Sequence, residues 1–246
     1  MNQIVENILA AYKSKEWKRA SSSCEEYISA CKLSFMENLT ADTATNFAGS
    51  VILFAQICAG EHKPWKAIPK LEDARGCLRF MEDFIQDREV FASTLYSFAT
   101  SYEMAGFAPE ALQYYRKVAE HTSDFELLEN AAYSAYFFSL REHGEIESSL
   151  KKAVETKIGK ETSLKLVAEA KEALSKLPKF DPIEQSEAFL KIRYDLETRI
   201  DQELSLLSDD TPFFVRYWEC KKRILLKEFG LTWKTPAECN PNMRFS

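Results

Sequence analysis

The chain has 246 residues, of which 46 % are hydrophobic and 28 % charged, so it can bury the core of one large domain or two small ones. It contains only 7 glycines and 8 prolines, roughly half the usual share, which argues against many-stranded folds and glycine-rich phosphate loops. Its formal net charge of −6 argues against a nucleic-acid-binding protein that depends on overall positive charge.

The six cysteines lack the C-x-x-C spacing of metal and redox motifs, and we expect reduced thiols and no cofactor. The first 17 residues lack a basic region followed by an apolar run, so we expect no secretory signal. No uninterrupted apolar run is long enough to predict a membrane span. These features predict a cytoplasmic or nuclear protein.

Apolar residues recur at helical spacing from the start of the chain to Phe229, and no strand pattern appears. Ile4, Ile8 and Ala11 mark a first helix, and Ala20, Cys24, Tyr27 and Cys31 mark a second. Further helices are predicted at 43–60, 69–86, 89–105, 108–121, 125–142, 145–156, 162–176, 182–207 and from Thr211-Pro212 to Phe229.

Turn and capping residues fall at the predicted helix ends. Gly60, Gly106, Gly144 and Gly230 are expected to end helices, and Pro69 is expected in a first turn. Ser123-Asp-Phe-Glu126 has the pattern of a capping box before the helix at 125–142.

The stretch from Ala92 to His121 has the spacing of a helical repeat. In a frame of about thirty-four residues beginning at Ala92, small residues fall at positions eight and twenty, glycine at fifteen and large residues between them. The residues in order are Leu95, Phe98, Ala99, Tyr102, Gly106, Ala111, Tyr115 and Val118. This stretch resembles the tetratricopeptide repeat.

Frames beginning at Met1, Ala48 and Asn130 match this repeat less well. In the frame from Met1, Lys15 stands where glycine is expected. In the frame from Ala48, Pro64 and Pro69 interrupt the second helix, and in the frame from Asn130, Phe137 stands where a small residue is expected. An unrelated helical bundle is the alternative fold.

The resemblance implies an all-α, right-handed α-solenoid of antiparallel helix pairs over residues 1–158. Longer helices at 159–230 are expected to cap it, followed by an irregular tail at 231–246. Relatives of this family usually hold a peptide or helix on the concave surface, so the resemblance implies a partner-binding groove. Val5, Leu9, Tyr96, Thr100, Ser134 and Phe138 occupy positions where chaperone-binding relatives carry a basic clamp, so we do not expect that activity.

The residues assigned to the groove are Tyr96, Thr100, Glu103, Tyr133, Phe138 and Arg141. The alternative for each aromatic residue is packing against the next helix.

A second candidate surface lies near the C-terminus. Residues 211–234 carry six basic and two acidic side chains, a balance of +4, which leaves −10 for the rest of the chain. The residues assigned to this surface are Arg216, Trp218, Lys222, Arg223 and Trp233. It suits an acidic partner, RNA or a membrane surface, and the alternative is a solvated helix face docked on the acidic remainder of the protein.

Catalytic motifs are not apparent. His62, His121 and His143 lie near predicted helix ends without a second ligand at metal-binding spacing. The sequence therefore predicts a non-catalytic adaptor that binds another protein. The alternatives are a permanent subunit of a larger complex and an RNA-binding or enzymatic regulator that uses the basic C-terminal segment.

Overall fold

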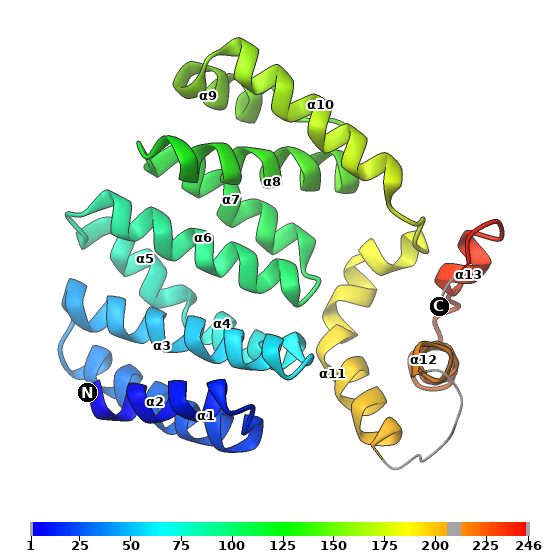
Figure 1. Cartoon of the computed structure of the whole chain (residues 1–246), viewed down its shortest axis with the longest axis horizontal. Coiled ribbons are helices and arrows are strands. Elements are labelled where there is room, and N and C mark those ends of the chain that lie inside the picture. Colours follow the sequence, from blue (N-terminus) through cyan, green and yellow to red (C-terminus); the bar gives the residue numbers. More distant parts are fainter. Residues whose placement is uncertain (1, 206–212, 245–246) are drawn as a thin grey trace. The chain divides into compact units, whose positions relative to one another are not determined.

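The computed structural model describes residues 2–205 and 213–244, and every regular element in these two ranges is a helix (Figure 1). The predicted all-α fold class is therefore confirmed. The chain divides into two compact units, Met1–Leu174 (unit 1) and Ser175–Ser246 (unit 2).

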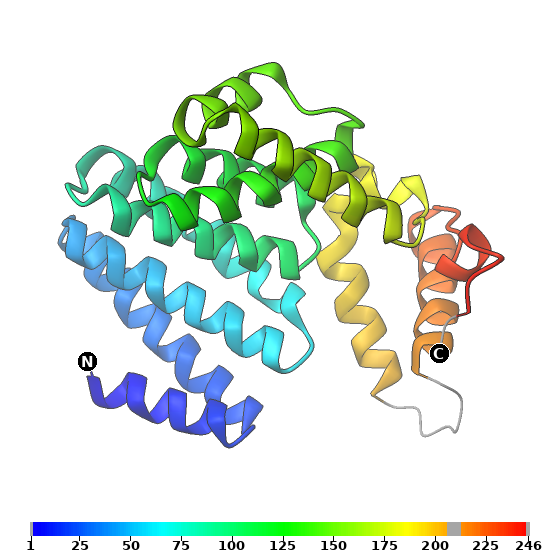
Figure 2. The same ribbon diagram turned by 45° about the horizontal axis from the view of Figure 1, so that its top comes forward.

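Unit 1 consists of helices that pack mainly against their neighbours in the chain. They are α1 (Asn2–Lys13), α2 (Trp17–Glu37), α3 (Ala41–Gly60), the 3₁₀ turn η1 (Pro64–Ala67), α4 (Ile68–Asp73), α5 (Arg75–Phe84), α6 (Arg88–Met104), α7 (Ala108–His121), α8 (Phe125–His143), α9 (Ser148–Ile158) and α10 (Lys160–Lys176), whose last two residues belong to unit 2. The most extensive contacts join α1 to α2, α2 to α3, α6 to α7 and α7 to α8 (Figure 2). Helix α3 also packs against α5 and α6, which joins successive helix pairs.

Side-chain caps account for several helix starts. Thr40 forms a capping box with Thr43 at α3, and the Asp87 carboxylate accepts from the backbone amides of Glu89 and Val90 at the start of α6. At α8 the cap is Asp124, whose carboxylate accepts from Leu127 N at 2.7 Å, instead of the predicted capping box at Ser123.

The single helix predicted at 69–86 is wrong in detail. The chain forms η1, then α4, and then breaks at Ala74 before α5. Pro69 lies in the first turn of α4, as predicted. The break separates two short buried faces, one containing Leu71 and the other Leu78.

One turn recurs after α1, α3 and α6. Lys15, His62 and Gly106 adopt left-handed backbone conformations, with φ of 58°, 62° and 76°. In each turn this residue donates its N–H to the carbonyl three residues earlier, and the next residue donates to the carbonyl five residues earlier, at 2.8–3.0 Å. These paired bonds define a Schellman motif. These residues occupy position fifteen of the repeat frames that begin at Met1, Ala48 and Ala92. The three positions therefore share one backbone conformation, although only Gly106 is a glycine.

Gly60 ends α3 as predicted, but for a different reason. A Cβ atom on Gly60 would lie 2.9 Å from the Trp17 ring and 3.0 Å from the Tyr12 ring. Glycine therefore permits close packing between α3 and the α1–α2 turn, and His62 supplies the left-handed conformation two residues later.

Among the helices of the described residues, only α3 has the length and apolar composition that would allow it to cross a membrane. Half of its most apolar stretch is buried inside the protein. Its buried residues include Phe47, Val51 and Phe54.

Unit 2 has its own core and comprises η2 (Pro182–Gln185), α11 (Glu187–Leu204), α12 (Phe213–Phe229) and α13 (Pro236–Cys239). Its buried residues are Phe189, Leu196, Ile200, Cys220, Ile224, Leu225 and Trp233. The predicted continuous helix from 182 is interrupted at Ser186, which is extended and caps α11 through Phe189 N. The predicted helix end at Leu207 and start at Thr211-Pro212 lie outside the described residues.

The segment predicted as an irregular tail contributes to this core. Trp233 is 2 % exposed, and α13 begins with a capping box between Thr235 and Glu238. The side-chain amide of Asn240 binds the backbone of Lys179. Its Oδ1 accepts from Lys179 N at 2.8 Å, and its Nδ2 donates to Lys179 O at 2.6 Å.

The division between the units falls later than the boundary predicted at residue 158. The hydroxyls of Tyr136 on α8 and Ser163 on α10 lie 2.8 Å apart and are both buried. This contact joins α10 to the helices before it. Residues 159–174, which were predicted to begin the C-terminal extension, therefore belong to unit 1.

Candidate functional site

Five aromatic side chains of α6, α7 and α8 form a continuous series of ring contacts, which we name the aromatic chain. In order, its members are Tyr96, Tyr115, Phe138, Phe137 and Tyr133. Tyr115 meets Tyr96 edge-on at 5.6 Å and stacks on Phe138 at 6.1 Å with an interplanar angle of 10°. These geometries are the favourable ones for aromatic pairs.

The middle of the aromatic chain is buried and its ends are accessible. Tyr115 and Phe138 are buried, whereas Tyr96, Tyr133 and Phe137 are half-buried. The side chains at the ends are therefore positioned by a buried central pair. The accessible rings at the two ends of the aromatic chain therefore have restricted motion.

A hydrogen bond from Tyr115 fixes the position of Glu103. The Tyr115 hydroxyl donates to Glu103 Oε2 at 2.5 Å. Burial, reinforced by the Glu103 carboxylate, raises the pKa of Tyr115 far above its usual value, so the phenol remains a donor. Burial and the same carboxylate also raise the pKa of Tyr96. Glu103 is exposed and is thus a negatively charged group of fixed position beside Tyr96.

The other residues assigned to the groove are placed as follows. The Thr100 hydroxyl donates to Ser97 O within α6 at 3.0 Å, and its side chain is half-buried. Arg141 lies 3.6 Å from the Glu142 carboxylate and is half-buried at the end of α8. Phe138, at 3 % exposed, is a packing residue of the aromatic chain and not a surface residue.

Two members of the aromatic chain were not assigned to the site from sequence. Tyr115 occupies a repeat position that fills the space between helices, and Phe137 occupies a position expected to be small and buried. In α8 the small buried residues are Ala131, Ala132, Ala135 and Ser139, whereas Phe137 is turned partly to solvent and Phe138 inward. The spacing of the three alanines, at 131, 132 and 135, was the signal that could have revealed this rotation.

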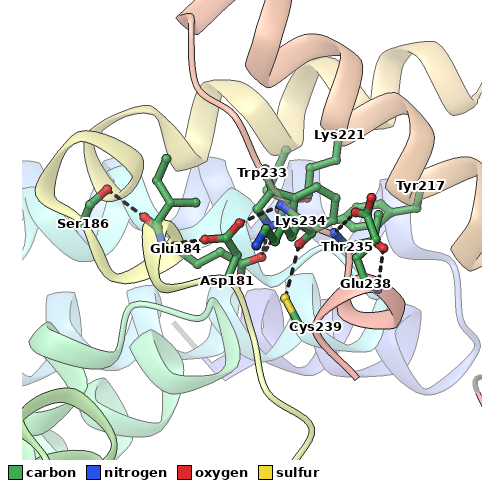
Figure 3. Close-up of polar contacts among 12 residues, drawn as sticks. Asp181, Glu184, Ser186, Tyr217, Lys221, Trp233, Lys234, Thr235, Glu238 and Cys239 are labelled. Carbon is green, nitrogen blue, oxygen red and sulfur yellow. Dashed lines mark hydrogen bonds and ion pairs between the residues drawn. The ribbon is translucent and has the colours of Figure 1, made fainter. Parts of the chain in front are cut away.

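In unit 2 a buried lysine, Lys221, lies among three aromatic rings, two of which, Trp233 and Tyr217, are labelled in Figure 3. Lys221 Nζ is 4.5 Å from the centre of the Trp233 ring, 5.2 Å from that of Phe189 and 5.8 Å from that of Tyr217. It also pairs with Glu184 Oε1 at 3.1 Å, and Trp233 Nε1 donates to the same oxygen at 2.5 Å. The carboxylate and the rings together compensate for burying the ammonium group.

Other hydrogen bonds connect the parts of unit 2. The Tyr217 hydroxyl donates to the buried Glu197 at 2.7 Å, and burial together with the Glu197 charge raises the pKa of Tyr217. Lys234 N donates to Asp181 Oδ2 at 2.6 Å. The charged and aromatic residues at this position therefore stabilise the packing of α12 and the C-terminal segment on η2 and α11 (Figure 3).

This arrangement redefines the residues assigned to the C-terminal surface. Trp233 is buried in the core of unit 2, whereas Trp218 and Arg216 are half-buried on α12, with Trp218 edge-on to Phe214 at 5.1 Å. Lys222 pairs with Glu238 at 2.6 Å, and Arg223 pairs with Glu203. Much of the positive charge of α12 is therefore paired within unit 2.

Comparison of the chain with protein-family models, with curated proteins and with solved structures finds no significant match.

The titratable groups of the described residues are mostly engaged in packing or paired within the protein. Burial raises the pKa of Cys24, Cys58 and Cys77 to about 12 each, so these thiols are poor nucleophiles. His121 Nε2 lies 3.5 Å from Glu82, while His62 and His143 lie at the ends of other helices. Within residues 2–205 and 213–244, no three His, Cys, Asp or Glu side chains are grouped to hold a metal ion.

Proposed function

We propose that the protein is a non-catalytic interaction scaffold that binds an apolar helix or peptide of a partner protein. The observation that carries this proposal is the aromatic chain, whose accessible ends belong to α6 and α8 and are held by a buried centre. Aromatic side chains dominate the energetics of protein interfaces, and rings that are already ordered lose little entropy on binding.

In this proposal, unit 1 is a right-handed solenoid similar to tetratricopeptide repeats. The recurring Schellman turn at Lys15, His62 and Gly106 supports it, because three frames of different sequence form the same turn at the same position. The packing of helices against their neighbours in the chain is also typical of such repeats. The helices of this solenoid are longer than those of the usual repeat, since α2 alone has 21 residues.

The composition of α6 indicates the kind of partner. Residues 90–102 contain no charged side chain. The half-buried Tyr96 and Thr100 lie within this stretch, and the first carboxylate after it is Glu103. An uncharged aromatic and hydroxyl-bearing surface favours an apolar segment of a partner over a highly charged one.

Affinity capture from the native cell, followed by mass spectrometry, tests the assignment. Tyr96→Ala and Tyr133→Ala are expected to lose partners that the unmodified protein retains. Phe125→Ala is the matched control, because Phe125 is an exposed aromatic residue at the start of α8 with 55 % exposure. An unchanged partner set for folded variants of both tyrosines would refute the assignment.

The second candidate function is a constitutive subunit of a larger complex. It is favoured by large apolar side chains exposed near the end of α2, Leu33 and Met36, and just after it, Leu39. Poor solubility of the isolated protein, relieved by coexpression with its partner, would support this role. RNA binding has less support, since Lys221, Lys222 and Arg223 each pair with a carboxylate of unit 2.

A further inference from the structure

A groove in unit 1 lies where α3 begins and where α5 is connected to α6. Its volume is about 580 Å³. We name it the α3–α6 groove, and it is lined by Ala41, Asp42, Thr45, Asn46, Phe84, Ile85, Gln86, Asp87 and Val90. None of these residues belongs to the aromatic chain.

The apolar wall of the groove is exposed but firmly supported. Phe84 is 63 % exposed, and Val90 is 39 % exposed. The Phe84 ring stacks on Phe80 at 4.6 Å, and Phe80 packs edge-on against Phe35 at 5.5 Å. Phe35 in turn stacks on the buried Phe47 at 6.2 Å. This series of rings joins an exposed phenylalanine to the core, so the wall is present before any ligand binds.

The groove is negatively charged. Two of its nine lining residues, Asp42 and Asp87, are carboxylates, and none is a cation. Asp87 uses Oδ1 to cap α6 through the amides of Glu89 and Val90. The nearby Arg88 is engaged elsewhere, because its guanidinium donates to Glu82 O at 2.8 Å.

We propose that the α3–α6 groove binds a short basic amphipathic segment of a partner protein. A bulky apolar side chain of that segment packs against Phe84 and Val90, and flanking Lys or Arg side chains face Asp42 and Asp87. The sign of the charge selects this partner over RNA and anionic membranes, which would be repelled. The proposal goes beyond the aromatic chain and does not depend on it.

Fluorescence anisotropy with two designed peptides tests this inference. Each is a labelled amphipathic helix of about 14 residues, roughly four turns, with a leucine face. The polar face is lysine in one peptide and glutamate in the other. We expect the full-length protein to bind the lysine peptide at physiological salt and the glutamate peptide at least about tenfold more weakly.

Substitutions locate the binding. Phe84→Ala is expected to weaken binding of the lysine peptide about tenfold, the loss appropriate to one large apolar contact. Asp42→Asn is expected to weaken it about threefold and to reduce its salt dependence. Phe125→Ala is the matched control, since it removes a phenylalanine of similar exposure, 55 % against 63 % for Phe84, outside the groove.

Three results would overturn the inference: no binding of the lysine peptide, equal binding of the two peptides, or equal affinities of Phe84→Ala and Phe125→Ala. Thermal unfolding of each variant confirms that it is folded, and Asp42→Asn provides a test independent of Phe84. A Tyr96→Ala variant separates this groove from the proposed function, because it is expected to bind the lysine peptide normally.

Discussion

Glu89 joins the start of α6 to the connection between α7 and α8. Its carboxylate accepts from the Thr122 hydroxyl at 2.5 Å, from Ser123 N at 2.7 Å and from the Ser123 hydroxyl at 2.6 Å. Hydrogen bonds of this kind stabilise the ionised form of the carboxyl group. They lower the pKa of Glu89 from its ordinary 4.5 to about 2.

We predict that Glu89→Gln destabilises the protein at neutral pH by about 1–2 kcal/mol. The full difference in pKa corresponds to about 3 kcal/mol, and partial contact of the carboxylate with solvent reduces it by about half. The lower pKa belongs to the folded state, so Glu89 contributes fully above its unfolded value of 4.5. The contribution is lost as the pH falls from there towards about 2.

Urea unfolding of the unmodified protein and Glu89→Gln between pH 7 and pH 3 measures this effect. The difference in free energy of unfolding is expected to be constant above about pH 5 and to decrease below it. Glu126→Gln is the control, because Glu126 is an exposed acid in the first turn of α8. A difference for Glu89→Gln that does not change with pH, or that is no larger than for Glu126→Gln, would refute the reasoning.

Three further predictions concern other contacts. Lys157 donates to the carbonyls of Ala119, Glu120 and Thr122 at 2.6–3.1 Å, so Lys157→Met is expected to lower the unfolding free energy by about 1–3 kcal/mol in urea titrations; no loss would show that water replaces the ammonium group. Trp233→Phe removes the hydrogen bond to Glu184 and is expected to accelerate amide exchange in unit 2 while leaving unit 1 unchanged; equal acceleration in both units would contradict their separate cores. Lys15→Gly and His62→Gly relieve left-handed strain and are expected to raise the free energy of unfolding by about 0.5–1 kcal/mol each, and with it the melting temperature, whereas Gly144→Ala, at φ 75°, is expected to lower both; the opposite signs would refute the assigned turn geometry.

Features encoded locally could be predicted from the sequence. The helices of unit 1 follow from apolar spacing, and their ends follow from residues such as Pro69, Gly106 and Gly144, because caps and turns depend on a few neighbouring residues. The break at Ala74 was not predicted, because the nearest glycine, Gly76, falls inside the first turn of α5 and not at the break. Packing of two short buried faces, instead of one continuous stripe, determines it.

Contacts between residues distant in the chain could not be predicted. Lys221 and Trp233 resemble a basic aromatic surface when the sequence is considered alone, and only their approach to Glu184 shows that they are buried. In α8, a rotation of one residue exchanges the roles of Phe137 and Phe138, since successive helical residues point about 100° apart. Sequence reasoning assigned three of the five members of the aromatic chain to the site, Tyr96, Tyr133 and Phe138, but not the face on which each lies.

The connection between α7 and α8 is held from both directions, and this has a consequence for the aromatic chain. Glu89 of α6 binds Thr122 and Ser123, while Lys157 of α9 binds the Thr122 carbonyl and two carbonyls in the last turn of α7. These contacts restrict the position of α8 relative to α6 and α7, and the Tyr115–Phe138 stack depends on that position. If the aromatic chain binds a partner, Glu89→Gln should therefore weaken binding without removing any contacting ring, because the surface would have to be ordered during association. If the rings serve only to pack the helices, the same substitution should change stability alone.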